Sequence, residues 1–306
     1  MPHETLRKAP GDLLKTRSSA AWLLLLAASC TLPLLHCATN SGSGAGDDGG
    51  PPDAAQPVEA GVFSPDPPPL PDNTVECAET TKQIYVLATD KVLYRFNPDK
   101  LEFVRVGQVA CPDTAGTFSM AIDRRGTAWV EYTDGRLFAV DTTTAACRAT
   151  AFRPGQSGFE TFVMGYAKND DATGETLYVS GVGLASLDTK TFDLQFLGSL
   201  TYGRTELTGL DTKLFAFSVA SGVIAGLDKT NGSTKITYRT TAVNEQAAFA
   251  FAQWGGDFWV FTGNDHSIVT QYSPADNKSA VVVQNTGMLI VGAGSSTCAP
   301  SSKPPK

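Results

Sequence analysis

The sequence predicts an all-β protein in which five similar four-stranded sheets form a closed ring. One pattern recurs five times: an apolar strand centred on an aromatic residue, a turn, a strand of alternating apolar residues and a polar turn. The aromatic residues are 44, 49, 37 and 44 residues apart, which is the period of the blades of a β-propeller. The chain also ends in a spare apolar strand that could close the ring. The five aromatic residues are Tyr85, Trp129, Tyr178, Phe215 and Trp259.

Each copy of the pattern contains four segments whose apolar and polar residues alternate as in strands. In the second copy we expect strands over residues 118–122, 128–132, 136–140 and 147–152. Thr133-Asp134-Gly135 supplies a hairpin turn, because glycine permits a positive φ. Every third strand ends in a polar turn whose side chains bond their own backbone and stop the ladder. These turns begin at Asn97, Asp141, Asp188, Asp228 and Ser273.

The first copy lacks an inner strand, since only a proline-rich segment precedes its aromatic strand at residues 83–87. Met288-Leu-Ile-Val291, near the end of the chain, aligns with the inner strand of the second copy at residues 120–122. We expect it to complete the first blade, which closes the ring and removes both sheet edges. The sequence therefore predicts a five-bladed propeller closed by its C-terminal strand.

Ring closure also indicates how the cysteines of this region pair. It would place Cys298 beside Cys77, which predicts a Cys77–Cys298 disulfide and leaves Cys111–Cys147 as the second bond. Four cysteines allow three pairings, so the closing strand decides between them and the even number does not.

The first 36 residues are typical of an export signal. A basic segment precedes the apolar run of residues 20–28, which is shorter than the roughly 20 residues of a spanning helix. Ala27-Ala28-Ser29-Cys30 and Leu34-Leu35-His36-Cys37 both resemble the lipobox of bacterial lipoproteins. Cys30 has the better box, but cleavage at Cys37 leaves an even number of cysteines, which favours Cys37 as the lipidated residue. Plain secretion is the alternative.

Residues 37–75 predict a disordered tether, because their Gly, Ser, Asp and Pro content cannot bury enough apolar area to offset the ordering entropy. We expect the propeller over residues 76–299 and a disordered tail over residues 300–306. No aspartate follows either candidate cysteine. By resemblance to lipoproteins, this implies sorting to the outer membrane, with the propeller held in the cell envelope by a lipid anchor.

Residues 77–298 resemble the secreted bacterial β-propeller proteins, including those with quinoprotein-like and YVTN-type repeats. The resemblance depends on Gly126-Thr-Ala-Trp-Val130, Asp134-Gly-Arg-Leu-Phe138 and Val140-Asp141. These motifs describe how a blade is built and imply no particular ligand. The tryptophan-docking motifs of true quinoproteins are not repeated in every blade, so we predict no cofactor.

Charge excludes one class of partner. The 306 residues carry 24 basic and 31 acidic side chains. Without residues 1–36, which hold four basic and two acidic ones, the net charge falls from −7 to near −9. Nucleic acids require a basic field, so we exclude them and expect a monomer that binds a protein or a glycan.

Carboxylates are the only plausible catalytic groups. His266 is expected in an exposed turn, and the cysteines of the propeller are expected to be paired. Propeller ligands usually sit where the chain enters the inner strands, which indicates Glu160, Glu206 and Glu245. Two of these could serve as acid and nucleophile or base in a carbohydrate-active hydrolase, which needs carboxyl groups about 5–10 Å apart. Solvated loop glutamates are the commoner explanation.

Three weaker possibilities remain. Asp170 and Asp171 lie in an acidic loop that could hold calcium, although its spacing does not match an EF-hand. Tyr202 and Trp254 could present stacking surfaces to a ligand. A lyase or lactonase with a central metal is the least favoured function. A non-enzymatic binding or scaffold protein of the envelope is the leading interpretation, and a carbohydrate-active hydrolase is the alternative.

Overall fold

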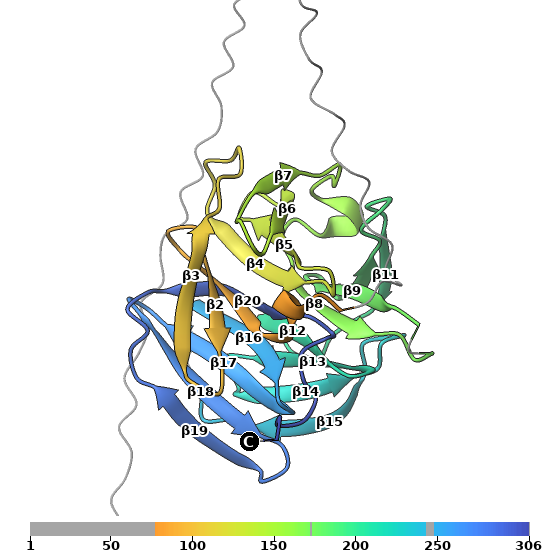
Figure 1. Ribbon diagram of the computed structural model, residues 1–306. Coiled ribbons are helices and arrows are strands. Elements are labelled where there is room, and N and C mark those ends of the chain that lie inside the picture. The colour runs from red at the N-terminus through yellow and green to blue at the C-terminus, as the bar shows by residue number, and fades with distance from the viewer. Residues whose placement is uncertain (1–76, 172, 243–247, 306) are drawn as a thin grey trace, which may run out of the picture. The chain divides into compact units, whose positions relative to one another are not determined.

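The structure is a computed structural model that describes residues 77–171, 173–242 and 248–305. It contains five antiparallel sheets of four strands each, which confirms the expected five-bladed propeller (Figure 1). The predicted signal segment, the tether, Cys30, Cys37 and Glu245 lie outside the described residues. No helix within the described ranges is long and apolar enough to cross a bilayer.

Each blade is named here by its strands, from the inner strand outward. Blade 1 consists of β20 (Ile290–Ser295), β1 (Ile84–Ala88), β2 (Val92–Asn97) and β3 (Glu102–Gln108). Blade 2 consists of β4 (Thr117–Ile122), β5 (Thr127–Tyr132), β6 (Leu137–Asp141) and β7 (Cys147–Ala149). Blade 3 consists of β8 (Val163–Lys168), β9 (Glu175–Ser180), β10 (Leu184–Leu187) and β11 (Leu194–Gly198).

Blade 4 consists of β12 (Thr205–Leu210), β13 (Lys213–Ser218), β14 (Val223–Leu227) and β15 (Thr234–Arg239). Blade 5 consists of β16 (Ala248–Trp254), β17 (Asp257–Gly263), β18 (Ser267–Ser273) and β19 (Lys278–Val283). Two short 3-10 helices, η1 (Glu79–Lys82) and η2 (Gln156–Gly158), precede blade 1 and blade 3. The strand β7 is shorter than expected, because the Thr150 hydroxyl donates to the Leu137 carbonyl and ends the pairing.

The five repeated aromatic residues lie on the second strand of each blade and are at most 8% exposed. Each is paired across the sheet with a small residue of the inner strand: Tyr85 with Gly294, Trp129 with Ala121, Tyr178 with Gly165, Phe215 with Thr208 and Trp259 with Ala252. A large ring beside a small residue fills the space between strands without a void. The aromatic residues therefore recur once per blade because each blade repeats this packing. The apolar cores lie between neighbouring blades.

The inner strands β4, β8, β12, β16 and β20 contact one another in turn around the ring. Small residues make this close approach possible. A Cβ on Gly209 of β12 would lie 2.1 Å from the carbonyl oxygen of Tyr166 on β8. A Cβ on Gly165 of β8 would lie 2.7 Å from the backbone of Leu207 on β12. Larger residues at these positions would push blades 3 and 4 apart.

The C-terminal strand β20 closes the ring by pairing antiparallel with β1, with Gly292 opposite Leu87. The expected strand covered residues 288–291, whereas the observed strand is Ile290–Ser295. The difference arises because the Gly-Ala-Gly segment, expected after the strand, forms its centre. Gly292 and Gly294 lie against Met120 and Ile122 of β4, where only a residue without a side chain fits closely.

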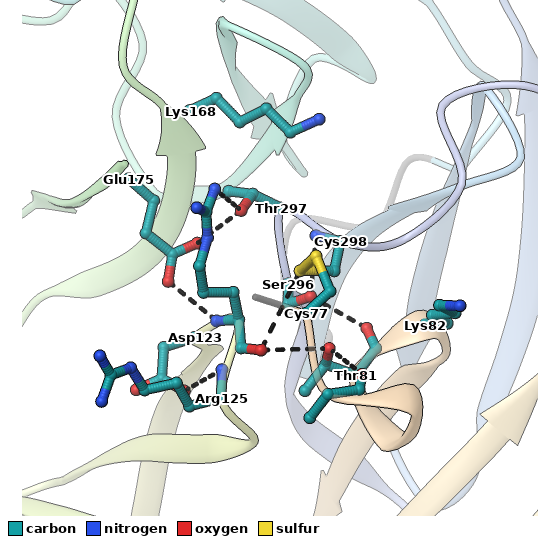
Figure 2. Close-up of a disulfide and its surroundings, with 12 residues drawn as sticks. Cys77, Thr81, Lys82, Asp123, Arg125, Lys168, Glu175, Ser296, Thr297 and Cys298 are labelled. Carbon is teal, nitrogen blue, oxygen red and sulfur yellow. Dashed lines mark hydrogen bonds and ion pairs between the residues drawn. A yellow bond between two sulfur atoms is a disulfide. The ribbon is translucent and has the colours of Figure 1, made fainter. Parts of the chain in front are cut away.

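Both predicted disulfides are present, Cys77–Cys298 and Cys111–Cys147. Beside the first, Arg124, Glu175 and Thr297 form a group that we call the closure cluster. Figure 2 labels Glu175 and Thr297 near the Cys77–Cys298 disulfide. The Thr297 hydroxyl donates to Glu175 Oε2 (2.6 Å), and the Arg124 backbone N–H donates to Glu175 Oε1 (2.8 Å). The Arg124 guanidinium donates to Thr297 Oγ1 (3.2 Å). Residues of blades 2 and 3 therefore hold the segment that follows β20.

Residues 300–305, which the sequence places in a disordered tail, contact blade 5. The Pro300 carbonyl accepts a hydrogen bond from the Gly255 N–H (2.7 Å). The Lys303 ammonium lies 3.3 Å from Asp257 Oδ2. The contacts of the chain with the propeller therefore continue beyond Cys298.

Candidate functional site

A pocket of about 450 Å³ lies where the chain enters the inner strands. All five inner strands contribute a residue near their first position: Thr117, Val163, Thr205, Ala248 and Val291. The inner strands all run in the same direction along the ring, so their starts meet at one end. We call this end the mouth. We expected ligands to bind where the chain enters the inner strands, and the pocket lies at that end.

Aromatic rings form much of the wall of the pocket. Phe118, Phe162, Tyr202 and Phe249 line it, and Phe118 is 36% exposed. The Arg204 guanidinium lies 5.2 Å from the centre of the Phe249 ring. Flat apolar faces at an open mouth give a ligand surfaces on which to stack.

Small polar groups complete the wall. The hydroxyls of Ser180 and Thr205 lie 3.1 Å apart and share a hydrogen bond, and both side chains are buried. Thr117 and Thr161 also line the pocket. Because a hydroxyl can both donate and accept, these groups can match either kind of polar atom on a ligand.

Glu206 of β12 is the carboxyl group that the described residues contribute to the pocket lining, and it is 2% exposed. The Ser119 hydroxyl of β4 donates to Glu206 Oε2 (3.4 Å) and accepts from the Met164 backbone N–H of β8 (3.2 Å). Three inner strands therefore meet at this carboxyl. Burial raises the pKa of Glu206 well above its usual value, and the nearby Glu131 raises it further.

Glu131 of β5 is a second buried carboxyl beside the first and is fully inaccessible to solvent. It pairs across the sheet with Ser119, and both of its oxygens accept from the Phe162 N–H (3.0 Å each). Burial raises the pKa of Glu131 to about 9. Ser119, Glu131 and Glu206 form what we call the mouth cluster, in which burial disfavours the charged form of both carboxyl groups.

Sequence reasoning did not single out Glu131. The signal was available, because Glu131 shares the inward face of its strand with Trp129, and the strand is otherwise apolar. A lone carboxyl at an inward position of a buried strand must be neutral or paired.

Of the three predicted glutamates, the two that the structure describes are not brought together. Glu206 lines the pocket, whereas Glu160 is exposed and its carboxylate lies beside Gly155 rather than in the lining. Glu245 lies outside the described residues. The loop before β8 does reach the pocket, but it does so through Thr161 and Phe162.

The two predicted stacking residues have different environments. Tyr202 lines the pocket and is partly exposed. Trp254 is 7% exposed and does not line it. Its indole N–H donates to the Lys82 carbonyl (2.8 Å), so Trp254 packs the end of blade 5 against η1.

The acidic loop does not gather metal ligands. Asp170 pairs with the Lys229 ammonium (2.5 Å), and Asp171 Oδ1 accepts from the Thr173 N–H and hydroxyl. No group of three or more candidate metal-ligating side chains occurs in the described part of the chain. His266 is exposed in the turn between β17 and β18, as expected.

Comparisons with known proteins identify no family. The sequence matches no protein-family model and no curated protein. A chain of a nidogen/laminin complex is 13% identical with a TM-score of 0.44, covering 70% of this chain and 85% of that chain. A Bacteroides thetaiotaomicron protein of unknown function is 11% identical with a TM-score of 0.44, covering 66% and 58%. A putative exported protein of Bacteroides fragilis is 12% identical with a TM-score of 0.37, covering 70% and 74%.

Proposed function

We propose that this protein is a binding protein of the cell envelope that recognises a glycan through the pocket at the mouth of its ring. The observation that supports the proposal is the chemistry of that pocket. Aromatic rings and small hydroxyl groups together line a pocket of about 450 Å³. Sugars present apolar faces and hydroxyls together, so such a lining matches both.

The same lining favours binding over hydrolysis. A glycoside hydrolase of the usual kind needs two carboxyl groups on either side of the scissile bond. Glu206 is the one carboxyl group of the described lining, and Glu160 lies outside it. The carbohydrate-active hydrolase is the alternative, and an assay for released reducing ends on the same glycans would detect it.

A glycan-binding screen of the mature chain, followed by calorimetric titration of any hit, tests the proposal. Tyr202→Ala removes a stacking ring of the pocket and is expected to weaken binding about fivefold, given about 1 kcal/mol for a stacked ring. Phe196→Ala is the matched control, because Phe196 is 50% exposed on the outer strand β11 and does not line the pocket. Binding that Phe196→Ala weakens as much as Tyr202→Ala would contradict the proposal, as would binding of protein partners alone.

The anchor belongs to the same proposal. We propose lipidation at Cys37, with Cys30 as the alternative and the outer membrane as the destination. Mass spectrometry of the N-terminal peptide of the mature protein identifies the modified cysteine. Cys37→Ser is expected to release the protein from the membrane fraction, and Cys30→Ser is the control. An unmodified N-terminus would mean plain secretion.

A further inference from the structure

The two buried carboxyl groups of the mouth cluster indicate which chemical group of a glycan the pocket can bind. Glu206 and Glu131 lie on either side of Ser119, and neither forms an ion pair within the described ranges. Two buried carboxyl groups that lie close together without a cation do not both ionise, because each charge would repel the other in a medium of low polarity. Glu206 is also buried by itself, and a buried carboxylate without an ion-pair partner is costly, so Glu206 is expected to carry a proton and to donate a hydrogen bond.

One oxygen of Glu206 contacts Ser119. Ser119 Oγ lies 3.4 Å from Glu206 Oε2 and accepts from the Met164 N–H. A proton on the other oxygen, Oε1, takes no part in this contact. Because Glu206 lines the pocket, its second oxygen can present the proton to a ligand.

An acceptor group lines the same pocket as this donor. Thr205 precedes Glu206, and its hydroxyl pairs with that of Ser180 on β9. A shared hydroxyl pair retains a free lone pair on each oxygen, so it can accept an N–H. Phe162 and Val163 bring apolar surface to the same lining. Donor, acceptor and apolar contact therefore occur together.

We infer that the pocket takes an N-acetylated amino sugar and holds its acetamido group at Glu206. The amide oxygen accepts from the Glu206 carboxyl, the amide N–H donates to the Thr205–Ser180 hydroxyls, and the methyl packs on the apolar wall. This inference depends on the proposed glycan function. A pocket of about 450 Å³ is at the lower end of the roughly 300–1,000 Å³ usual for small ligands, which suits one or two sugar units.

A matched pair of sugars tests the inference on the mature full chain. Tri-N-acetylchitotriose and cellotriose differ only in an acetamido or a hydroxyl group at each C2. We expect the wild-type protein to bind the chitotriose at least about tenfold more tightly, since one well-placed hydrogen bond accounts for that factor. Equal binding of the two sugars, or a preference for cellotriose, overturns the inference and leaves the proposed glycan function standing.

Variants at Glu206 identify the group responsible. Glu206→Gln keeps a donor and should keep the preference, whereas Glu206→Met should reduce it to about one. Glu160→Gln is the control, because Glu160 is exposed outside the lining. If Glu206→Met does not fold, Thr205→Val removes the acceptor and should reduce the preference instead. A preference that survives both folded variants overturns the inference, and failure to bind any oligosaccharide overturns the proposed function as well.

Discussion

Buried glutamates occur at both ends of the ring, and their surroundings differ. In the closure cluster, Glu175 accepts hydrogen bonds from Thr297 and from the Arg124 backbone, and its Oε2 lies 3.7 Å from the Arg124 Nε. Burial raises its pKa to about 7, and these hydrogen bonds oppose the rise. In the mouth cluster, Glu206 has a serine hydroxyl and a second carboxyl as neighbours, and burial raises its pKa well above the usual value.

The difference separates a structural carboxyl from one available to a ligand. At the closure end, Arg124 and Thr297 belong to distant parts of the chain, so their bonds to Glu175 connect the chain end to blades 2 and 3. At the mouth, Glu206 forms no ion pair with another described residue, and it lines an open pocket. A buried polar group that lacks a hydrogen-bond partner lowers the free energy of unfolding. Such a group is expected at a site where a bound ligand supplies the missing partner.

The largest expected effect concerns the closure end. A chain that ends at Thr286 lacks β20 and leaves unpaired edges on β1 and gaps beside β4 and β16. We expect it to lose cooperative thermal unfolding, followed by near-ultraviolet circular dichroism. The control is Cys77→Ser/Cys298→Ser in the full chain, which removes the disulfide but keeps the strand. That double variant should unfold cooperatively, with a loss of about 5 kcal/mol. A truncated chain that melts like the full one would show that β20 is not needed.

A smaller loss is expected when the cation of the closure cluster is removed. Arg124→Met leaves Glu175 buried beside Thr297 without its guanidinium neighbour, and breaking a buried pair in this way costs about 3 kcal/mol. Urea unfolding at pH 8 measures it. The double variant Arg124→Met/Glu175→Gln should recover much of the loss, because no carboxyl then remains to be compensated. Additive losses would mean that Arg124 and Glu175 do not act together.

Substitution of a carboxyl group in the mouth cluster is expected to stabilise the folded protein, whereas substitution in the closure cluster destabilises it. The pKa of Glu131 is about 9 in the folded protein and near 4.5 in the unfolded chain. The folded state therefore binds an extra proton between these values, and the free energy of unfolding falls as the pH rises from about 4.5 to 9. Glu131→Gln removes the contribution of Glu131 to this slope, while Glu175 and Glu206 keep theirs, and it should stabilise the protein by up to roughly 3 kcal/mol at pH 7. Urea unfolding from pH 5 to 8 measures the slope, and an unchanged slope would show that Glu131 is ionised when folded.

The elements that alternation and spacing describe were predicted closely from the sequence. The strands of blade 2, the closing role of the chain end and both disulfides follow from such local patterns. The closing strand itself was expected two residues early. The sequence places Gly292 and Gly294 after the expected strand, and the need for glycine at these positions becomes visible only when β20 lies against β4. Small residues can mark either a turn or a close contact, and the sequence alone does not distinguish the two.

The sequence by itself determined the number of blades, their order and the face that carries the pocket, because each depends on repeats and strand direction. Only the tertiary structure decided which side chains meet there. Tyr202 and Trp254 carry the same stacking potential, yet only Tyr202 lines the pocket. Glu206, Ser119 and Glu131 come from three strands of two blades. Their contact depends on how tightly the inner strands approach the axis, which is a property of the closed ring and of no single segment.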